Sequence, residues 1–132
     1  MAREKAMRRV IQQDAAGCGI AVVATIAGRS HEEALDAVKA AFRPRKPKAL
    51  YTHAKHLKAA LRSFKVKTGE RLIPSRSRRY SDLEHDTVLK IGRAGDRYWH
   101  WVAWDAANKR DIDPGNPPKK RPRCLSFLRV ER

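Results

Sequence analysis

The sequence has few cysteines, no long apolar run and little negative charge. Two cysteines, Cys18 and Cys124, are too few for a disulfide framework, although a single bridge between them fits the count. We therefore expect a reduced, cytoplasmic protein. The main apolar run, residues 19–27, is about half the length of a membrane span, and the polar residues 12–14 interrupt any pattern of a secretion signal. These features predict a soluble chain without a membrane span.

Acidic residues are outnumbered by basic ones, at 14 against 30, which gives a net charge of +16. Such a surface attracts nucleic acids, acidic proteins and anionic lipids. The basic runs lie in predicted loops, at residues 43–48, 76–79 and 119–123. Charge runs of this kind are usually solvated surface. A basic protein that binds nucleic acid, or a virion-type structural protein, is therefore the alternative function, and a peptide or protein substrate could be acidic.

Helical periodicity is confined to the first half of the chain. It predicts three helices, over residues 18–27, 30–43 and 52–64. Ser30 and Glu33 have the spacing of a capping box at the start of the second helix. Thr52 is expected to cap the third helix.

The second half carries the strand signals. An edge strand is expected over residues 64–67, and an antiparallel meander over 87–92, 98–104 and 110–113. Residues 74–79 are typical of an exposed loop, while 124–130 are compatible with a last strand or a short helix. Helices followed by strands predict one α+β domain, residues 1–132, with a helical half packed on an antiparallel sheet.

Three residues have the chemistry of a thiol hydrolase. Cys18 opens the predicted core helix, where free N–H groups and the helix dipole stabilise a thiolate. His100 lies in an otherwise apolar strand and could act as the base. Asp113 ends the next strand, and antiparallel pairing brings the end of one strand beside the start of its neighbour. We therefore expect Asp113 to orient His100.

The motif residues resemble the papain-like cysteine peptidases that process bacteriocin precursors after a double-glycine leader. They are Gln12, Asp14, Cys18, Gly19 and Ala21, then His100 and Val102, then Asp113 and Pro114. The resemblance implies a papain-like fold in which Cys18 is the nucleophile, His100 the general base and acid, and Asp113 the orienting group. It also implies that Gln12 and the backbone N–H of Cys18 hold the oxyanion. The sequence differs from that family at Gly17, where an acidic residue is usual.

Each of these residues also has an ordinary structural explanation. Cys18 and His100 could be packed core residues, and Asp113 could be a turn former before Pro114. Gln13 is the nearest rival to Gln12 as oxyanion donor. Asp111 shares the direction of Asp113 on an extended strand and is an alternative orienting group.

Other candidates point to less specific roles. His53 and His56 have a helical spacing that can hold a metal, but no cluster completes the site, so we expect solvent-exposed histidines and no metal or organic cofactor. Cys124 is expected to be structural. The three tryptophans, 99, 101 and 104, could pack in the core, line a substrate cleft or stack on bases.

Overall fold

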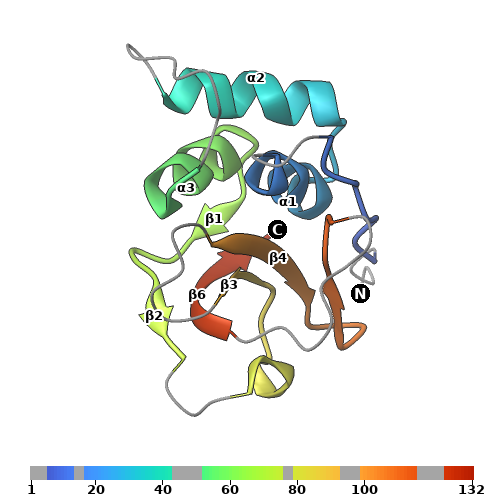
Figure 1. The fold of residues 1–132 in the computed structure, drawn as a ribbon, viewed down its shortest axis with the longest axis vertical. Helices are drawn as coiled ribbons and strands as arrows, with labels where there is room; N and C mark the ends of the chain where they lie inside the picture. The colour runs from blue at the N-terminus through green and yellow to red at the C-terminus, as the bar shows by residue number, and fades with distance from the viewer. Residues whose placement is uncertain (1–5, 14–16, 43–51, 76–78, 93–98, 116–123) are drawn as a thin grey trace.

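The computed structural model describes residues 6–13, 17–42, 52–75, 79–92, 99–115 and 124–132. Within them the protein is α+β, as predicted, with its three α-helices on one side of an antiparallel sheet (Figure 1). The helices are α1 (Cys18–Ala27), α2 (His31–Ala41), α3 (Ala54–Ser63) and the short 3-10 helix η1 (Tyr80–Asp82). The strands are β1 (Lys67–Thr68), β2 (Ile73–Pro74), β3 (Thr87–Ile91), β4 (His100–Asp105), β5 (Arg110–Ile112) and β6 (Cys124–Glu131).

Helix α1 is the central element of the helical half. All its residues from Cys18 to Ile26 are buried, because the segment is apolar on every side. It contacts β4 below it and α2 above it, and α3 lies beside it (Figure 1). Gly28 ends the helix in the left-handed conformation, at φ 66°, and its N–H donates to the carbonyl of Ala24.

The capping box predicted for the second helix is confirmed. Ser30 is the N-cap of α2, its hydroxyl accepts the N–H of Glu33 at 3.1 Å, and the Glu33 carboxylate accepts the N–H of Ser30. Ala34 and Val38 are buried on the inner face. The acidic first turn of α2 therefore faces solvent.

The predicted cap of the third helix is wrong. His53, not Thr52, is the N-cap of α3, and the side chain of His56 accepts the N–H of His53 at 2.9 Å. Thr52 is buried instead, and its carbonyl accepts the indole N–H of Trp101 at 3.0 Å. Thr52 thus ties the start of α3 to the sheet, which its sequence position did not indicate.

The described strands pair in the order β1-β6-β3-β4-β5, and β2 also pairs with β6. The predicted meander of β3, β4 and β5 is confirmed, with Thr87 opposite Trp104 and Ala103 opposite Ile112. Residues 124–131 form a strand rather than a helix. That strand lies between β1 and β3, so the last segment of the sequence is inside the sheet.

Two local predictions are corrected by the structure. The edge strand expected at 64–67 is β1, Lys67–Thr68, because Lys65 has a φ of +63° and the chain turns there. Pro74, expected to begin a loop, belongs to β2, whose two-residue length at the sheet edge tolerates proline. The expected loops at 43–48 and 119–123 lie outside the described residues, as do 76–78 and the turn within 93–98.

The two faces of the sheet carry separate apolar clusters. Trp101 and Ala103 belong to the cluster that includes the helices, whereas Val102 and Trp104 belong to the cluster on the opposite face. This alternation follows from the two-residue period of a strand. None of the described helices has the length and apolar content needed to cross a membrane.

Candidate active site

The thiol of Cys18 lies at the amino end of α1. Gly17 is the N-cap, and the first helical hydrogen bond runs from the N–H of Ala21 to the carbonyl of Gly17 at 3.0 Å. The N–H groups of residues 18–20 therefore have no partner inside the helix. Cys18 is 7% exposed, so these groups and the helix dipole act on the sulfur with little solvent screening.

His100 and Asp113 lie side by side, as the strand pairing predicted. His100 is the first residue of β4, and Asp113 directly follows β5. The Nε2 atom of His100 is 2.6 Å from Oδ1 of Asp113, and both residues are buried. Asp111 is exposed and accepts the hydroxyl of Tyr80 at 3.3 Å, so the structure places Asp113 rather than Asp111 at the imidazole.

The side chain of Cys18 also lies within interaction range of the His100 imidazole and acts on its pKa. Because Nε2 binds Asp113, Nδ1 is the ring nitrogen left for the thiol. Burial lowers the pKa of His100, but the interactions with Asp113 and Cys18 outweigh it and raise the pKa to about 9. The ring therefore holds its proton at neutral pH, between a sulfur and a carboxylate.

Gln12 lies next to the turn that carries Asp113. Its backbone N–H donates to the carbonyl of Pro114 at 2.8 Å. Gln12 is half-buried, whereas Gln13 is exposed. Asp14, another motif residue, lies outside the described residues.

Gly19 allows the first turn of α1 to lie directly against Thr52. A Cβ atom at Gly19 would lie 2.0 Å from Oγ1 of Thr52 and 2.9 Å from its Cβ. Real Cβ atoms do not approach so closely, so any larger residue would displace α1 or Thr52. Glycine after Cys18 therefore keeps the thiol-bearing turn in its place.

Aromatic rings surround the residue before His100. Trp99 is half-buried, with its ring 4.9 Å from that of His53 and 6.3 Å from that of Trp101. The Nζ atom of Lys90 lies 4.4 Å from the Trp99 ring centroid. Trp101 and Trp104 are core residues, so Trp99 is the tryptophan that remains partly exposed next to His100.

The expectation of two solvent-exposed histidines is wrong for His56. Its ring is buried and stacks on Phe42 at 3.8 Å, because α2 and α3 pack against each other there. Burial, together with Lys55 and His53, lowers the pKa of His56. Among the described residues no group of three or more His, Cys, Asp or Glu could hold a metal ion.

Cys124 differs from Cys18 in its surroundings. Both cysteines are free, so the possible bridge is not formed. The Cys124 thiol donates to the carbonyl of Ser126 at 3.3 Å, and burial raises its pKa to about 11. Cys124 thus has the properties of a structural thiol.

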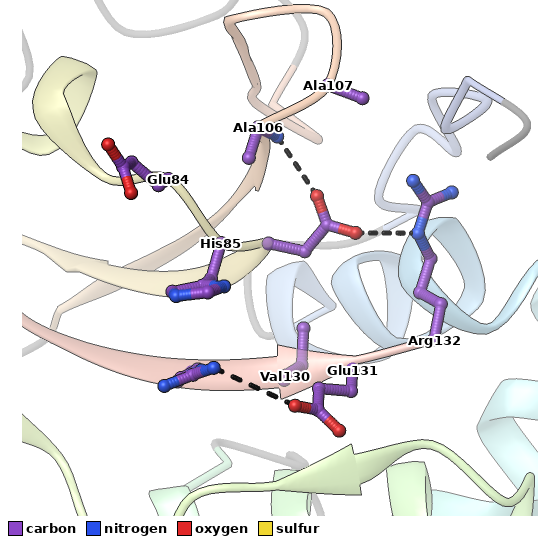
Figure 2. Close-up of a pocket in the computed structure, with 9 residues that line it drawn as sticks. Glu84, His85, Ala106, Ala107, Val130, Glu131 and Arg132 are labelled. Carbon is purple, nitrogen blue, oxygen red and sulfur yellow. Dashed lines mark hydrogen bonds and ion pairs between the residues drawn. The ribbon is translucent and has the colours of Figure 1, made fainter. Parts of the chain in front are cut away.

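A polar hollow of about 540 Å³ lies at the end of β4 that is away from His100 (Figure 2). Asp86 accepts the N–H of Ala106 at 2.9 Å and pairs with Nε of Arg132 at 2.8 Å, while Arg129 pairs with Glu131. None of the residues that line the hollow is a cysteine. Four of its charged residues form two separate ion pairs, Asp86 with Arg132 and Arg129 with Glu131. The hollow is therefore separate from the Cys18 site.

Sequence reasoning missed Arg9, to which no prediction assigned a role. Its Nε donates to the backbone carbonyl of Asp113 at 2.7 Å. No periodicity or motif spacing marks Arg9, and only its place three residues before Gln12 could have drawn attention to it.

No protein-family model matches the chain, and no curated protein matches it. The resemblance to the double-glycine leader peptidases therefore depends on the motif residues themselves.

Proposed function

We propose that the protein is a papain-like cysteine peptidase that uses Cys18, His100 and Asp113. The observation that carries the proposal is the pairing of His100 with Asp113 at 2.6 Å, beside Cys18, whose side chain acts on the same imidazole. A nucleophile, a base and an orienting carboxylate are the three groups that thiol hydrolysis needs. The three come from α1, β4 and the segment after β5, so they meet only in the folded chain.

In the proposed reaction Nδ1 of His100 holds the proton given up by Cys18, and the sulfur bonds to the substrate carbonyl carbon as the carbonyl π pair moves onto the oxygen. The oxyanion is held by the N–H of Cys18 and the side-chain amide of Gln12. His100 then protonates the leaving amine as the C–N bond breaks, which leaves a thioester. Water, deprotonated by His100, attacks the thioester, and the release of the sulfur yields a carboxylate product.

The charge of the protein favours an acidic peptide as substrate. The net charge is +16, and Lys90 lies over Trp99 next to His100. An anionic side chain near the scissile bond would meet this ammonium group. We also propose a cytoplasmic location, which the two free cysteines support.

Thiol labelling tests the proposed nucleophile. We expect iodoacetamide at pH 7 to alkylate Cys18 at least about tenfold faster than Cys124, because Cys18 lies at the amino end of α1 beside His100, whereas burial raises the pKa of the Cys124 thiol to about 11. Peptide mass mapping assigns the two sites. His100→Gln should slow the labelling of Cys18 without changing that of Cys124. Equal, slow labelling of both thiols in the wild type would contradict the proposal.

A second candidate function is binding of a polyanion, and the charges of α3 favour it. Lys55, Lys58 and Arg62 lie on the outer side of α3, and Lys65, Lys67 and Arg71 follow in the next segment. Hydrogen bonds from Lys58 to the carbonyl of Glu70 and from Arg62 to Thr68 hold that segment beside α3. We call these six residues the α3 basic face. By contrast, α2 is acidic in its first turn.

Salt-dependent binding of a labelled oligonucleotide tests the α3 basic face. The triple change Lys55→Gln, Arg62→Gln and Lys67→Gln should weaken binding and reduce the salt slope by about 0.7–0.9 for each phosphate that the protein no longer neutralises. A control with the same loss of charge, Arg8→Gln with Lys39→Gln and Lys109→Gln, should retain most of the binding. Equal losses in both triples would show a dependence on net charge alone and would exclude this face as a site.

A further inference from the structure

We propose that Arg9 is a positioning residue that holds the Asp113 turn and the Gln12 segment in the arrangement the site needs. The proposal rests on the proposed function, since it assigns a task to Asp113 and Gln12. It concerns the hydrogen bonds between the segment at residues 9–12 and the turn at residues 113–115.

All three carbonyls of the Asp113 turn are bound by this segment. Arg9 Nε donates to the carbonyl of Asp113 at 2.7 Å, and a terminal nitrogen of the same guanidinium donates to the carbonyl of Gly115. The carbonyl between them, of Pro114, accepts the backbone N–H of Gln12 at 2.8 Å. Arg9 therefore binds the two outer carbonyls of the turn, and the backbone of Gln12 binds the central one.

The shape of the turn controls the direction of the Asp113 carboxylate. Oδ1 of Asp113 accepts the N–H of Gly115 at 2.7 Å and is also the atom 2.6 Å from Nε2 of His100. A change in the turn that moves the Gly115 N–H would rotate the carboxylate relative to the imidazole. By holding the carbonyls of Asp113 and Gly115, Arg9 limits that movement.

The same segment is also attached to the helix that carries the thiol. The N–H of Val10 donates to the hydroxyl of Thr25 at 3.1 Å, and this hydroxyl donates to the carbonyl of Ala21 at 2.8 Å. Both Thr25 and Ala21 belong to α1. Arg9 therefore lies in a segment that links α1 to the Asp113 turn.

Arginine suits this position better than lysine. Its guanidinium is planar and presents several N–H donors in a fixed geometry, so one side chain can bind two carbonyls at once. A lysine ammonium keeps the charge but is a compact group on a flexible stem. Arg9→Lys should therefore restore part of the function that Arg9→Ala removes.

The test compares Arg9→Ala, Arg9→Lys and the control Arg8→Ala, whose side chain is exposed and adjacent. The first readout is the NMR titration of the His100 ring, which is faced by Cys18 from α1 and by Asp113 after β5. In the wild type we expect a midpoint of about 9. Arg9→Ala should move it down toward 6.5, Arg9→Lys should give an intermediate value, and Arg8→Ala should give the wild-type value.

The second readout is the rate of peptide cleavage, which Arg9→Ala should lower by about tenfold to a hundredfold, since misplacement of about 1 Å can cost that much. A wild-type His100 midpoint in Arg9→Ala would overturn the positioning role, whatever the activity. A lowered midpoint in a protein that cleaves nothing would uphold the positioning role and reject the peptidase. Loss of folding in both Arg9 variants, with Arg8→Ala folded, would assign Arg9 to the fold and overturn the proposal.

Discussion

Substitution of Gly19 by alanine should destabilise the protein and disturb the thiol next to it. The new Cβ atom would lie 2.0 Å from Oγ1 of Thr52 and 3.0 Å from its Cγ2. Rotation of the Thr52 side chain would not relieve the contact, because its Cβ also lies 2.9 Å from the new atom, and the backbone is held by the bond from the Trp101 indole to the Thr52 carbonyl at 3.0 Å. The first turn of α1 must therefore shift, and Cys18 with it.

The magnitude follows from two opposing effects. Overpacking of a close-packed site costs about 1–3 kcal/mol. Alanine in place of glycine within a helix returns about 0.5–1 kcal/mol. The free energy of unfolding should therefore fall by about 1–2 kcal/mol, and the Tm of a chain of this length by roughly 4–7 °C, at about 2 cal/mol/K of unfolding entropy per residue.

Urea unfolding of a double-mutant cycle with Thr52→Ala is the assay. Thr52 Oγ1 is buried without a hydrogen-bond partner among the described residues, so Thr52→Ala alone should cost little. In the double variant the closest contact is gone, and we expect it to recover about half of the loss caused by Gly19→Ala. The alkylation rate of Cys18 should change most in Gly19→Ala, less in the double variant and least in Thr52→Ala.

Two outcomes would refute this reasoning. One is a Gly19→Ala variant as stable as the wild type or more stable, which would mean that the first turn of α1 has room for a methyl group. The other is strict additivity of the two changes, since residues in contact show a coupling energy.

Three further predictions concern titration and capping. Because the pKa of His100 is raised in the folded protein, protonation of this imidazole stabilises the fold. The contribution is complete below pH 6.5 and is lost as the pH rises through about 9. The shift of the His100 pKa from 6.5 to about 9 corresponds to a free energy of about 3 kcal/mol, at about 1.4 kcal/mol for each pH unit. Solvent screening reduces this contribution to roughly 1–2 kcal/mol. Urea unfolding at pH 6 and pH 9.5 measures it, and an equal decline in His100→Gln would contradict it. Cys18→Ala should lower the His100 midpoint, because one of the groups that raise its pKa is removed; an NMR titration with an unchanged midpoint would argue against the interaction with Cys18. Ser30→Ala should cost about 1 kcal/mol, since the capping box is lost, and thermal unfolding that matches the wild type would disprove this.

Local signals in the sequence predicted much of the helical half. The capping box of Ser30 and Glu33 and the uninterrupted apolar run after Cys18 each depend on residues close together in the chain. The cap of α3 was missed because Thr52 meets Gly19 and Trp101, which are distant in sequence. A buried threonine and a capping threonine have the same local pattern.

The candidate site was predictable where strand pairing determines it. The β4–β5 hairpin brings Asp113 to His100, and alternation of strand and turn residues marks that hairpin. The place of β6 between β1 and β3 could not be read from its residues, because pairing across the sheet involves positions 33 to 64 apart in the chain. Arg9 was missed for a similar reason, since its partners are backbone carbonyls that carry no sequence signature.

Cleavage of a mixed peptide library biased toward acidic sequences tests the central claim most directly. Mass spectrometry of new amino termini would compare the wild type with Cys18→Ala, and Arg8→Ala would serve as the folded control. We predict cleavage by the wild type and by Arg8→Ala, and none by Cys18→Ala. Equal cleavage by Cys18→Ala, or no cleavage by a folded wild type, would contradict the assignment of the Cys18, His100 and Asp113 group as a peptidase site.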